Sequence, residues 1–280
     1  MVINYYLLTK PGIILGNLIT VAAGVMLAST KTFNLWLFCA TLIGLGLIIA
    51  SACVCNNYID RTLDQKMKRT ENRPLAKGLI SGRNALFFAI TLVLLGNAFL
   101  LKFTNVLSLC IADFGFLVYV ALYSPSKTRT VYGTAIGSVA GAVCPVVGYC
   151  AVSNRIDSGA LILFAIMALW QMPHFFAIAL YRLEDYAAAS IPVLPIKKGI
   201  PRTKIHMVLY IIAFIGAALM LTVYGYTGYL YLVIAALLGL NWLRLCLRGF
   251  KTNNDQLWAR QMFRHSLIVI TALFATAAFL

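Results

Sequence analysis

Long apolar stretches alternate with short polar ones along the whole chain. A helix that crosses the hydrocarbon core of a bilayer needs about 20 consecutive apolar residues, and nine runs approach or exceed that length. They lie near residues 11–30, 33–56, 84–103, 105–124, 131–152, 159–181, 205–225, 227–247 and 265–280. The pattern predicts an all-α fold, a polytopic membrane bundle of about nine transmembrane helices. We interpret residues 1–280 as a single membrane-embedded domain.

The composition supports the bilayer as the solvent of this chain. Of the 280 residues, 61% are hydrophobic and 11% are charged, whereas soluble domains are about 45–50% apolar and about 25% charged. Two polar connections are longer than the others, at about 57–83 and 182–204. They hold five of the eight acidic residues, so we expect these two loops to share one function.

The basic residues determine the predicted orientation. The net charge is +15, but short loops between membrane spans explain these charges better than a nucleic-acid partner does. Of the 23 Lys and Arg residues, 20 lie near the N-terminus or in the loops after the second, fourth, sixth and eighth runs. Because cytoplasmic loops are enriched in Lys and Arg, we expect the N-terminus and these loops in the cytoplasm and the C-terminus outside.

Three polar residues at the end of the second run form a candidate metal site. Asn56, Asp60 and Asp64 are spaced four residues apart, so a helix that continues past the apolar run places all three on one face. Carboxylate and amide oxygens suit Mg²⁺, which typically binds through one or two carboxylates together with substrate phosphates. The alternative is a set of ordinary loop salt bridges, which fits any single charge better than it fits the aligned three.

Basic residues close to these acids are candidates for phosphate binding. Lys68, Arg69 and Arg73 follow the acids in the first long loop, and Lys127 and Arg129 come from another loop on the same side. Guanidinium groups bind phosphate oxygens in a bidentate manner. Acids for a metal and bases for phosphate, at a membrane surface, predict a site for a lipid diphosphate.

Several motifs resemble a known family. The stretch 56–74, with Asp60, Asp64, Arg69 and Arg73, resembles the first aspartate-rich motif of UbiA-type prenyltransferases. The stretches 132–149, 170–176, 185–188 and 191–195 resemble the branch of that family that farnesylates haem. The similarity covers essentially the whole chain. This chain departs from the superfamily pattern at Tyr181. The second motif of the superfamily commonly has an aspartate at this position, four residues before that of Asp185.

The resemblance implies an enzyme and its substrates. A Mg²⁺-dependent prenyltransferase of this kind transfers the farnesyl group of farnesyl diphosphate to a vinyl group of haem B, and water addition completes haem O. It implies Asp60, Asp64 and Asp185 as catalytic residues, with these three and Asn56 as metal ligands. The substrate-binding residues that it implies are Asn56, Lys68, Arg69, Arg73, Tyr123, Lys127, Arg129, Trp170, Gln171 and His174. It also implies the bacterial inner membrane as location, and a haem A synthase or terminal oxidase assembly as partner.

Two residues inside the apolar runs have open interpretations. His174 either contacts haem, through the iron or a propionate, or is a hydrogen-bonded histidine that lines the bundle; Pro173 before it is expected to bend or break the helix. Asp113 either touches substrate or makes a polar contact between helices. Glycines at 133, 137 and 141 recur every four residues, which favours close helix packing.

Two other functions fit parts of the pattern. A prenyltransferase for an aromatic quinone precursor would need a basic anchor for its acceptor but no cavity of porphyrin size. A transporter for an anionic solute would need paired broken helices at the midplane of the bilayer, whereas the charges here gather in loops.

Overall fold

The computed structural model describes residues 2–29 and 32–279, and this part of the chain is all-helical. Nine of its helices are long and apolar enough to cross a membrane, which confirms the predicted polytopic bundle. In chain order the elements are α1 (Val2–Leu8), α2 (Pro11–Ala28), α3 (Leu35–Asp64), α4 (Gly82–Phe103), α5 (Val106–Leu117), the π-helical η1 (Val118–Tyr123), α6 (Ser124–Ser126), α7 (Gly133–Ser153), α8 (Ser158–Tyr181), α9 (Leu183–Ala188), α10 (Leu194–Lys198), α11 (Ile200–Val223), α12 (Tyr229–Arg248), the 3₁₀ turn η2 (Gly249–Lys251) and α13 (Asp255–Phe279).

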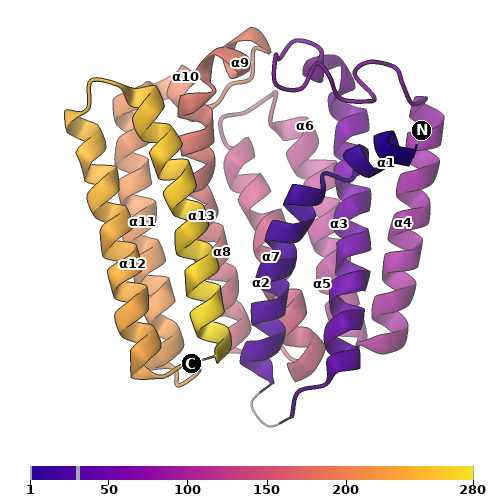
Figure 1. Ribbon diagram of the computed structural model, residues 1–280, viewed down its shortest axis with the longest axis vertical. Helices are drawn as coiled ribbons and strands as arrows, with labels where there is room; N and C mark the ends of the chain where they lie inside the picture. Colours follow the sequence, from indigo (N-terminus) through magenta and orange to yellow (C-terminus); the bar gives the residue numbers. More distant parts are fainter. Residues whose placement is uncertain (1, 30–31, 280) are drawn as a thin grey trace.

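The polar segments gather at one end of the bundle. Figure 1 shows α1, α9, α10 and the loop between α3 and α4 together at the top of the view, and the C-terminus at the bottom. The N-terminal helix lies at the top. The two long loops of the sequence are therefore neighbours in space, although about a hundred residues separate them. We call this end the polar end of the bundle.

Helices α2 and α7 pack backbone to backbone near the centre. A Cβ at Gly24 would lie 2.1 Å from the carbonyl oxygen of Pro145, and one at Gly148 would lie 2.2 Å from that of Val21. Small residues permit this approach, which replaces the hydrophobic driving force that helices lack among lipid tails. Helix α2 also contacts α13, and α7 also contacts α8. The close contact of α2 with α7 therefore holds the N-terminal helices next to α8 and α13.

Helix ends differ from the apolar runs where polar residues continue a helix. Helix α3 continues from Leu35 to Asp64, as the spacing of Asn56, Asp60 and Asp64 requires. Helix α13 begins at Asp255, where Asn254 accepts a hydrogen bond from Leu257 N at 2.9 Å. The start of the ninth helix near residue 265 was wrong. The apolar run shows only the part of the helix that lies in lipid, and the capped helix begins earlier in the sequence.

Helix α8 runs unbroken through Pro173, so the alternative of a break was wrong. A proline removes one backbone hydrogen bond and crowds the carbonyl one turn earlier. In a membrane helix, neighbouring helices and local adjustment compensate for this loss. The continuous helix keeps Trp170, Gln171 and His174 on one element that contacts α7, α11 and α13.

Candidate active site

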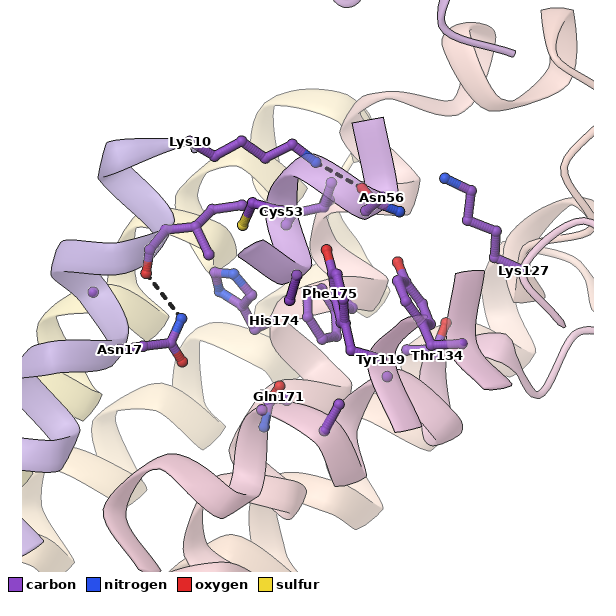
Figure 2. A pocket seen from close by; sticks show the side chains of 18 of the residues that line it. Lys10, Asn17, Cys53, Asn56, Tyr119, Lys127, Thr134, Gln171, His174 and Phe175 are labelled. Atoms are coloured by element: carbon purple, nitrogen blue, oxygen red, sulfur yellow. Dashed lines mark hydrogen bonds between the residues drawn. The ribbon is translucent and has the colours of Figure 1, made fainter. Parts of the chain in front are cut away.

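A cavity of about 690 Å³ opens beneath the polar end of the bundle. Its walls come from α2, α3, α5, η1, α7, α8 and α13, and from the loops after α3 and α9. Charged side chains line its upper part, and mainly apolar and aromatic side chains line the rest. Figure 2 labels several of the lining residues, with Lys10, Asn56 and Lys127 in the upper row and Gln171 lower in the view. The volume lies within the range of about 300–1,000 Å³ typical of small-molecule sites.

Asp60 is the most connected acid of the cavity. One of its carboxylate oxygens, Oδ2, accepts a hydrogen bond from Asn56 Nδ2 at 2.8 Å and forms an ion pair with Lys127. Its other oxygen, Oδ1, has no hydrogen-bond partner among the residues that the structure describes. Asp60 is 4% exposed, so the free oxygen is a strong potential ligand for a cation in the cavity.

Asp64 is held by a single base of its own loop. Arg73 NH1 donates to both carboxylate oxygens of Asp64, at 2.9 and 2.8 Å. The hydroxyl of Thr70 donates to the backbone oxygen of Asp64 at 3.0 Å, which ties the loop back onto the end of α3. Both acids of the site therefore face a base, and their negative charges are compensated without any ligand.

Lys10 is a site residue that the sequence analysis did not identify. It lies between α1 and α2, and its Nζ donates to Asn56 Oδ1 at 2.7 Å. Its backbone has a φ of 52°, in the left-handed region, which turns the chain into α2. Burial lowers the pKa of Lys10 to about 8. A single lysine before the first span has the sequence signature of a topology signal, and no local pattern links it to residue 56.

Tyr123 and Lys127 reach the cavity because α7 offers glycines opposite them. A Cβ at Gly137 would lie 2.8 Å from the ring of Tyr123, and one at Gly133 would lie 2.9 Å from the Cα of Lys127. Tyr123 stacks on Tyr119 at 5.2 Å within η1, and π-helical turns frequently occur at functional sites. The stripe of glycines at 133, 137 and 141 therefore allows close packing, as expected. The residues that pack against Gly133 and Gly137 belong to the site.

Trp170, Gln171 and His174 line the part of the cavity farther from the charges. Gln171 Nε2 donates to the backbone oxygens of Ser138 and Met167, both at 3.1 Å. A Cβ at Gly141 would lie 2.2 Å from Gln171 Oε1, so the third glycine of the stripe makes room for this side chain. The rings of Trp170 and His174 stack at 4.6 Å.

Three of the expected site residues do not line the cavity. Lys68 and Arg129 are exposed and lie outside it, whereas Arg69 lies at its edge. Asp185 also lies outside the lining and faces Arg182 at 3.8 Å. Its neighbour Tyr186 lines the cavity instead, and burial raises the pKa of Tyr186.

In residues 2–29 and 32–279, no group of three or more His, Cys, Asp or Glu residues is arranged so that it could hold a metal ion by itself. The carboxylates at the cavity are two, Asp60 and Asp64, with the amide of Asn56 beside them. Metal sites of this kind take their remaining ligands from substrate phosphates and water.

Asp113 lies outside the cavity and accepts a hydrogen bond from Asn97 Nδ2 at 3.2 Å. Of the two interpretations of this residue, the structure has the polar contact between helices.

The fold and site together define an intramembrane enzyme site for an amphiphile, with ionic groups at the polar end and an apolar chamber below. The family model described as UbiA prenyltransferase family matches residues 17–268, and the chain belongs to this family.

Proteins of known name agree with this assignment, and solved structures share the fold. The chain is 59% identical over 278 residues to Protoheme IX farnesyltransferase of Protochlamydia amoebophila. The alignment covers 99% of this chain and 98% of that relative. It is 53% identical to the protein of the same name from Serratia proteamaculans, covering 98% and 93%. The structure of a digeranylgeranylglyceryl phosphate synthase superimposes with a TM-score of 0.81 at 20% identity, covering 100% and 99%. A UbiA homologue from Archaeoglobus fulgidus bound to GPP and Mg²⁺ gives 0.76 at 15% identity, covering 98% and 99%.

Proposed function

We propose that this protein transfers the farnesyl group of farnesyl diphosphate to a vinyl group of haem B, with addition of water, to give haem O and diphosphate. The relatives that cover nearly the whole chain at 53–59% identity carry the name Protoheme IX farnesyltransferase. The observation that carries the proposal is the arrangement of Asp60 with Lys127 and Asp64 with Arg73 at the polar end of a large apolar cavity.

Binding of the diphosphate exchanges the partners of these ion pairs. Lys127 and Arg73 line the cavity together with their carboxylates, so they can donate to diphosphate oxygens when a substrate enters. Each carboxylate would then need a new positive partner, because an unpaired buried charge is very unfavourable. Lys10 and Arg69 also line this region and add positive charge. Lys68, Arg129 and Asp185 remain predictions for residues that act at the rim.

The donor set at Asp60 and Asp64 fits Mg²⁺. Four carboxylate oxygens and the Asn56 amide oxygen are hard ligands, and Asp60 Oδ1 is already free of other partners among the described residues. Asn56 Oδ1 accepts from Lys10, so Lys10 would have to turn toward the diphosphate for Asn56 to serve as a ligand. When bound, Mg²⁺ neutralises the charge that develops on the leaving diphosphate.

The reaction breaks the bond between C1 of the farnesyl group and its diphosphate oxygen, and the electron pair leaves with the diphosphate. The fixed positive charges of Lys127, Arg73 and Lys10 stabilise that leaving group. The vinyl group of haem B attacks C1 and forms the new carbon–carbon bond. Water adds to the resulting cation next to the porphyrin and loses a proton, which leaves the hydroxyl of haem O. The aromatic walls formed by Tyr119, Tyr123 and Trp170 keep bulk water from the allylic cation.

The polar end is proposed to face the cytoplasm of a bacterial cell, with the protein in its inner membrane. The distribution of Lys and Arg supports this orientation. A haem A synthase or terminal oxidase assembly would receive the product on the membrane.

Extraction of haems from membranes that express the chain tests the proposal directly. We expect haem O with the native chain and Mg²⁺, and a loss of about 10²–10³-fold in its formation for Asp60→Ala and for Asp64→Ala, because each removes a ligand of the Mg²⁺ that stabilises the leaving diphosphate. Glu71→Ala is the matched control: Glu71 is an exposed carboxylate of the same loop and lies outside the cavity. Absence of any farnesylated haem from folded native protein with both substrates supplied would refute the acceptor, and aromatic acceptors would then be assayed.

A further inference from the structure

Two side chains of α8, one helical turn apart, bind the same residue of α13. Trp170 Nε1 donates to the backbone oxygen of Ser266 at 2.9 Å, and His174 Nδ1 lies 2.7 Å from the hydroxyl of Ser266. Ser266 is fully buried. These contacts are separate from the two ion pairs of the site, which join Asp64 to Arg73 and Asp60 to Lys127.

The hydroxyl of Ser266 has only one proton, and its second contact determines where that proton goes. Ser266 Oγ donates to the backbone oxygen of Phe263 at 2.6 Å. A carbonyl oxygen can only accept, so a distance this short requires the hydroxyl proton to lie between the two oxygens. The hydroxyl must therefore accept from His174. This assigns the proton of the neutral imidazole to Nδ1 and leaves the lone pair on Nε2.

The Nε2 atom of His174 is free. It has no hydrogen-bond partner in the part of the chain that the structure describes, and it is not among the fully enclosed unpartnered atoms. His174 lines the cavity, where Figure 2 shows its ring between Asn17 and Phe175. The ring centroids of Trp170 and Phe263 lie 4.6 and 5.0 Å from that of His174, and this packing restricts the orientation of the imidazole.

A fixed, neutral imidazole with a bare Nε2 in an apolar cavity has the chemistry of a haem-iron ligand. Histidine ligands of metals usually donate the other ring N–H to a hydrogen-bond acceptor, which sets the tautomer and raises the basicity of the ligating nitrogen. Ser266 supplies that acceptor here.

We infer that Ser266 is a positioning residue that holds His174 in its Nδ1–H form, so that Nε2 ligates the iron of the acceptor haem. The inference rests on the proposed function, in which haem B is the acceptor. Iron bound to Nε2 anchors the macrocycle in the apolar chamber, below the charged groups. The same anchor selects for a metallated porphyrin, because protoporphyrin IX carries the same vinyl groups but no iron.

Ligand-binding spectroscopy on the purified full-length protein, without farnesyl diphosphate, tests this role. Ferrous haem B bound to the native chain should show the iron–histidine stretching band in resonance Raman spectra. His174→Ala should lose this band and regain imidazole ligation when free imidazole is added. Ser266→Ala should bind haem B about tenfold more weakly, as for other residues that orient a metal ligand, and should bind protoporphyrin IX as the native chain does.

Thr276→Val is the matched control, because it removes a hydroxyl of the same helix that bonds to the backbone of α13 and lies outside the cavity. We expect it to retain the iron–histidine band. Haem bound to the native chain without a histidine band would overturn the inference and leave the proposed acceptor intact. So would a Ser266→Ala variant with unchanged haem affinity and spectrum. No haem binding by the folded native chain would instead overturn the proposed acceptor, and the inference with it.

Discussion

Lys127 and Asp60 form an ion pair at the polar end of the cavity, although 67 positions separate them in the sequence. Lys127 follows α6, and Asp60 lies in the last turns of α3. The same Asp60 oxygen accepts from Asn56, so α3 and the segment after α6 meet at one atom. The pair keeps a buried carboxylate compensated before substrate arrives, and it gives the lysine a defined position from which a diphosphate can be bound.

Substitution of Lys127 should weaken substrate binding far more than substitution of Arg129. Lys127→Met removes a charge that faces both Asp60 and the cavity, and a hydrogen bond to a charged group contributes about 1.5–3 kcal/mol. We expect KM for farnesyl diphosphate to rise by about 10–100-fold on this basis. Arg129→Met, which changes an exposed residue outside the cavity, should alter KM less than about threefold. Steady-state kinetics in detergent or nanodiscs measure both. Equal effects would show that Arg129 binds diphosphate as the sequence predicted.

Affinity for farnesyl diphosphate should fall as the pH rises above about 8. Burial lowers the pKa of Lys10 to about 8, so the free enzyme loses this positive charge at higher pH, while a bound diphosphate favours the charged form. By linkage, the dissociation constant should then rise by up to about tenfold per pH unit. Binding titrations between pH 7 and 9 measure the trend. Lys10→Arg should make binding independent of pH over this range, because arginine stays charged; an unchanged pH profile in that variant would assign the trend to another group.

Gly141→Ala should destabilise the bundle beside the part of the cavity that Gln171 lines. The new methyl group would lie 2.2 Å from Gln171 Oε1, so Gln171 must leave its hydrogen bonds to Ser138 and Met167. Overpacking of this kind costs about 1–3 kcal/mol. Gly216→Ala is the control, since nothing lies within 4 Å of a Cβ there. Thermal unfolding in detergent should show a lower midpoint temperature for Gly141→Ala only. Similar midpoints for both variants would mean that Gln171 moves aside without any loss of stability.

Fusion reporters should confirm the proposed orientation. Green fluorescent protein joined after residue 204 should fluoresce, because that loop is expected in the cytoplasm. Alkaline phosphatase joined at the C-terminus should be active, since nine spans place that end outside. The exchanged reporters, phosphatase after residue 204 and fluorescent protein at the C-terminus, should both be silent. The reverse pattern at both positions would invert the orientation and place the diphosphate site on the outer face.

The sequence by itself determined the properties that depend on local periodicity. The length of the apolar runs specified nine spans, because a bilayer sets the number of residues in a crossing helix. The four-residue spacing of Asn56, Asp60 and Asp64 put them on one face of α3, because helical geometry is the same in every context. Helix starts such as Asp255 were less visible, because a polar helical turn and a polar loop have the same composition.

Only the tertiary structure decided which distant residues complete the site. Lys10 reaches Asn56 across 46 positions, and His174 reaches Ser266 across 92. No local pattern distinguishes Lys127 from Arg129, two residues later, although one is paired in the cavity and the other is exposed. Side-chain direction at these positions follows from how helices pack, through contacts such as those of Gly137 with Tyr123. Packing between helices depends on the whole set of neighbours, so it is decided only when the bundle is assembled.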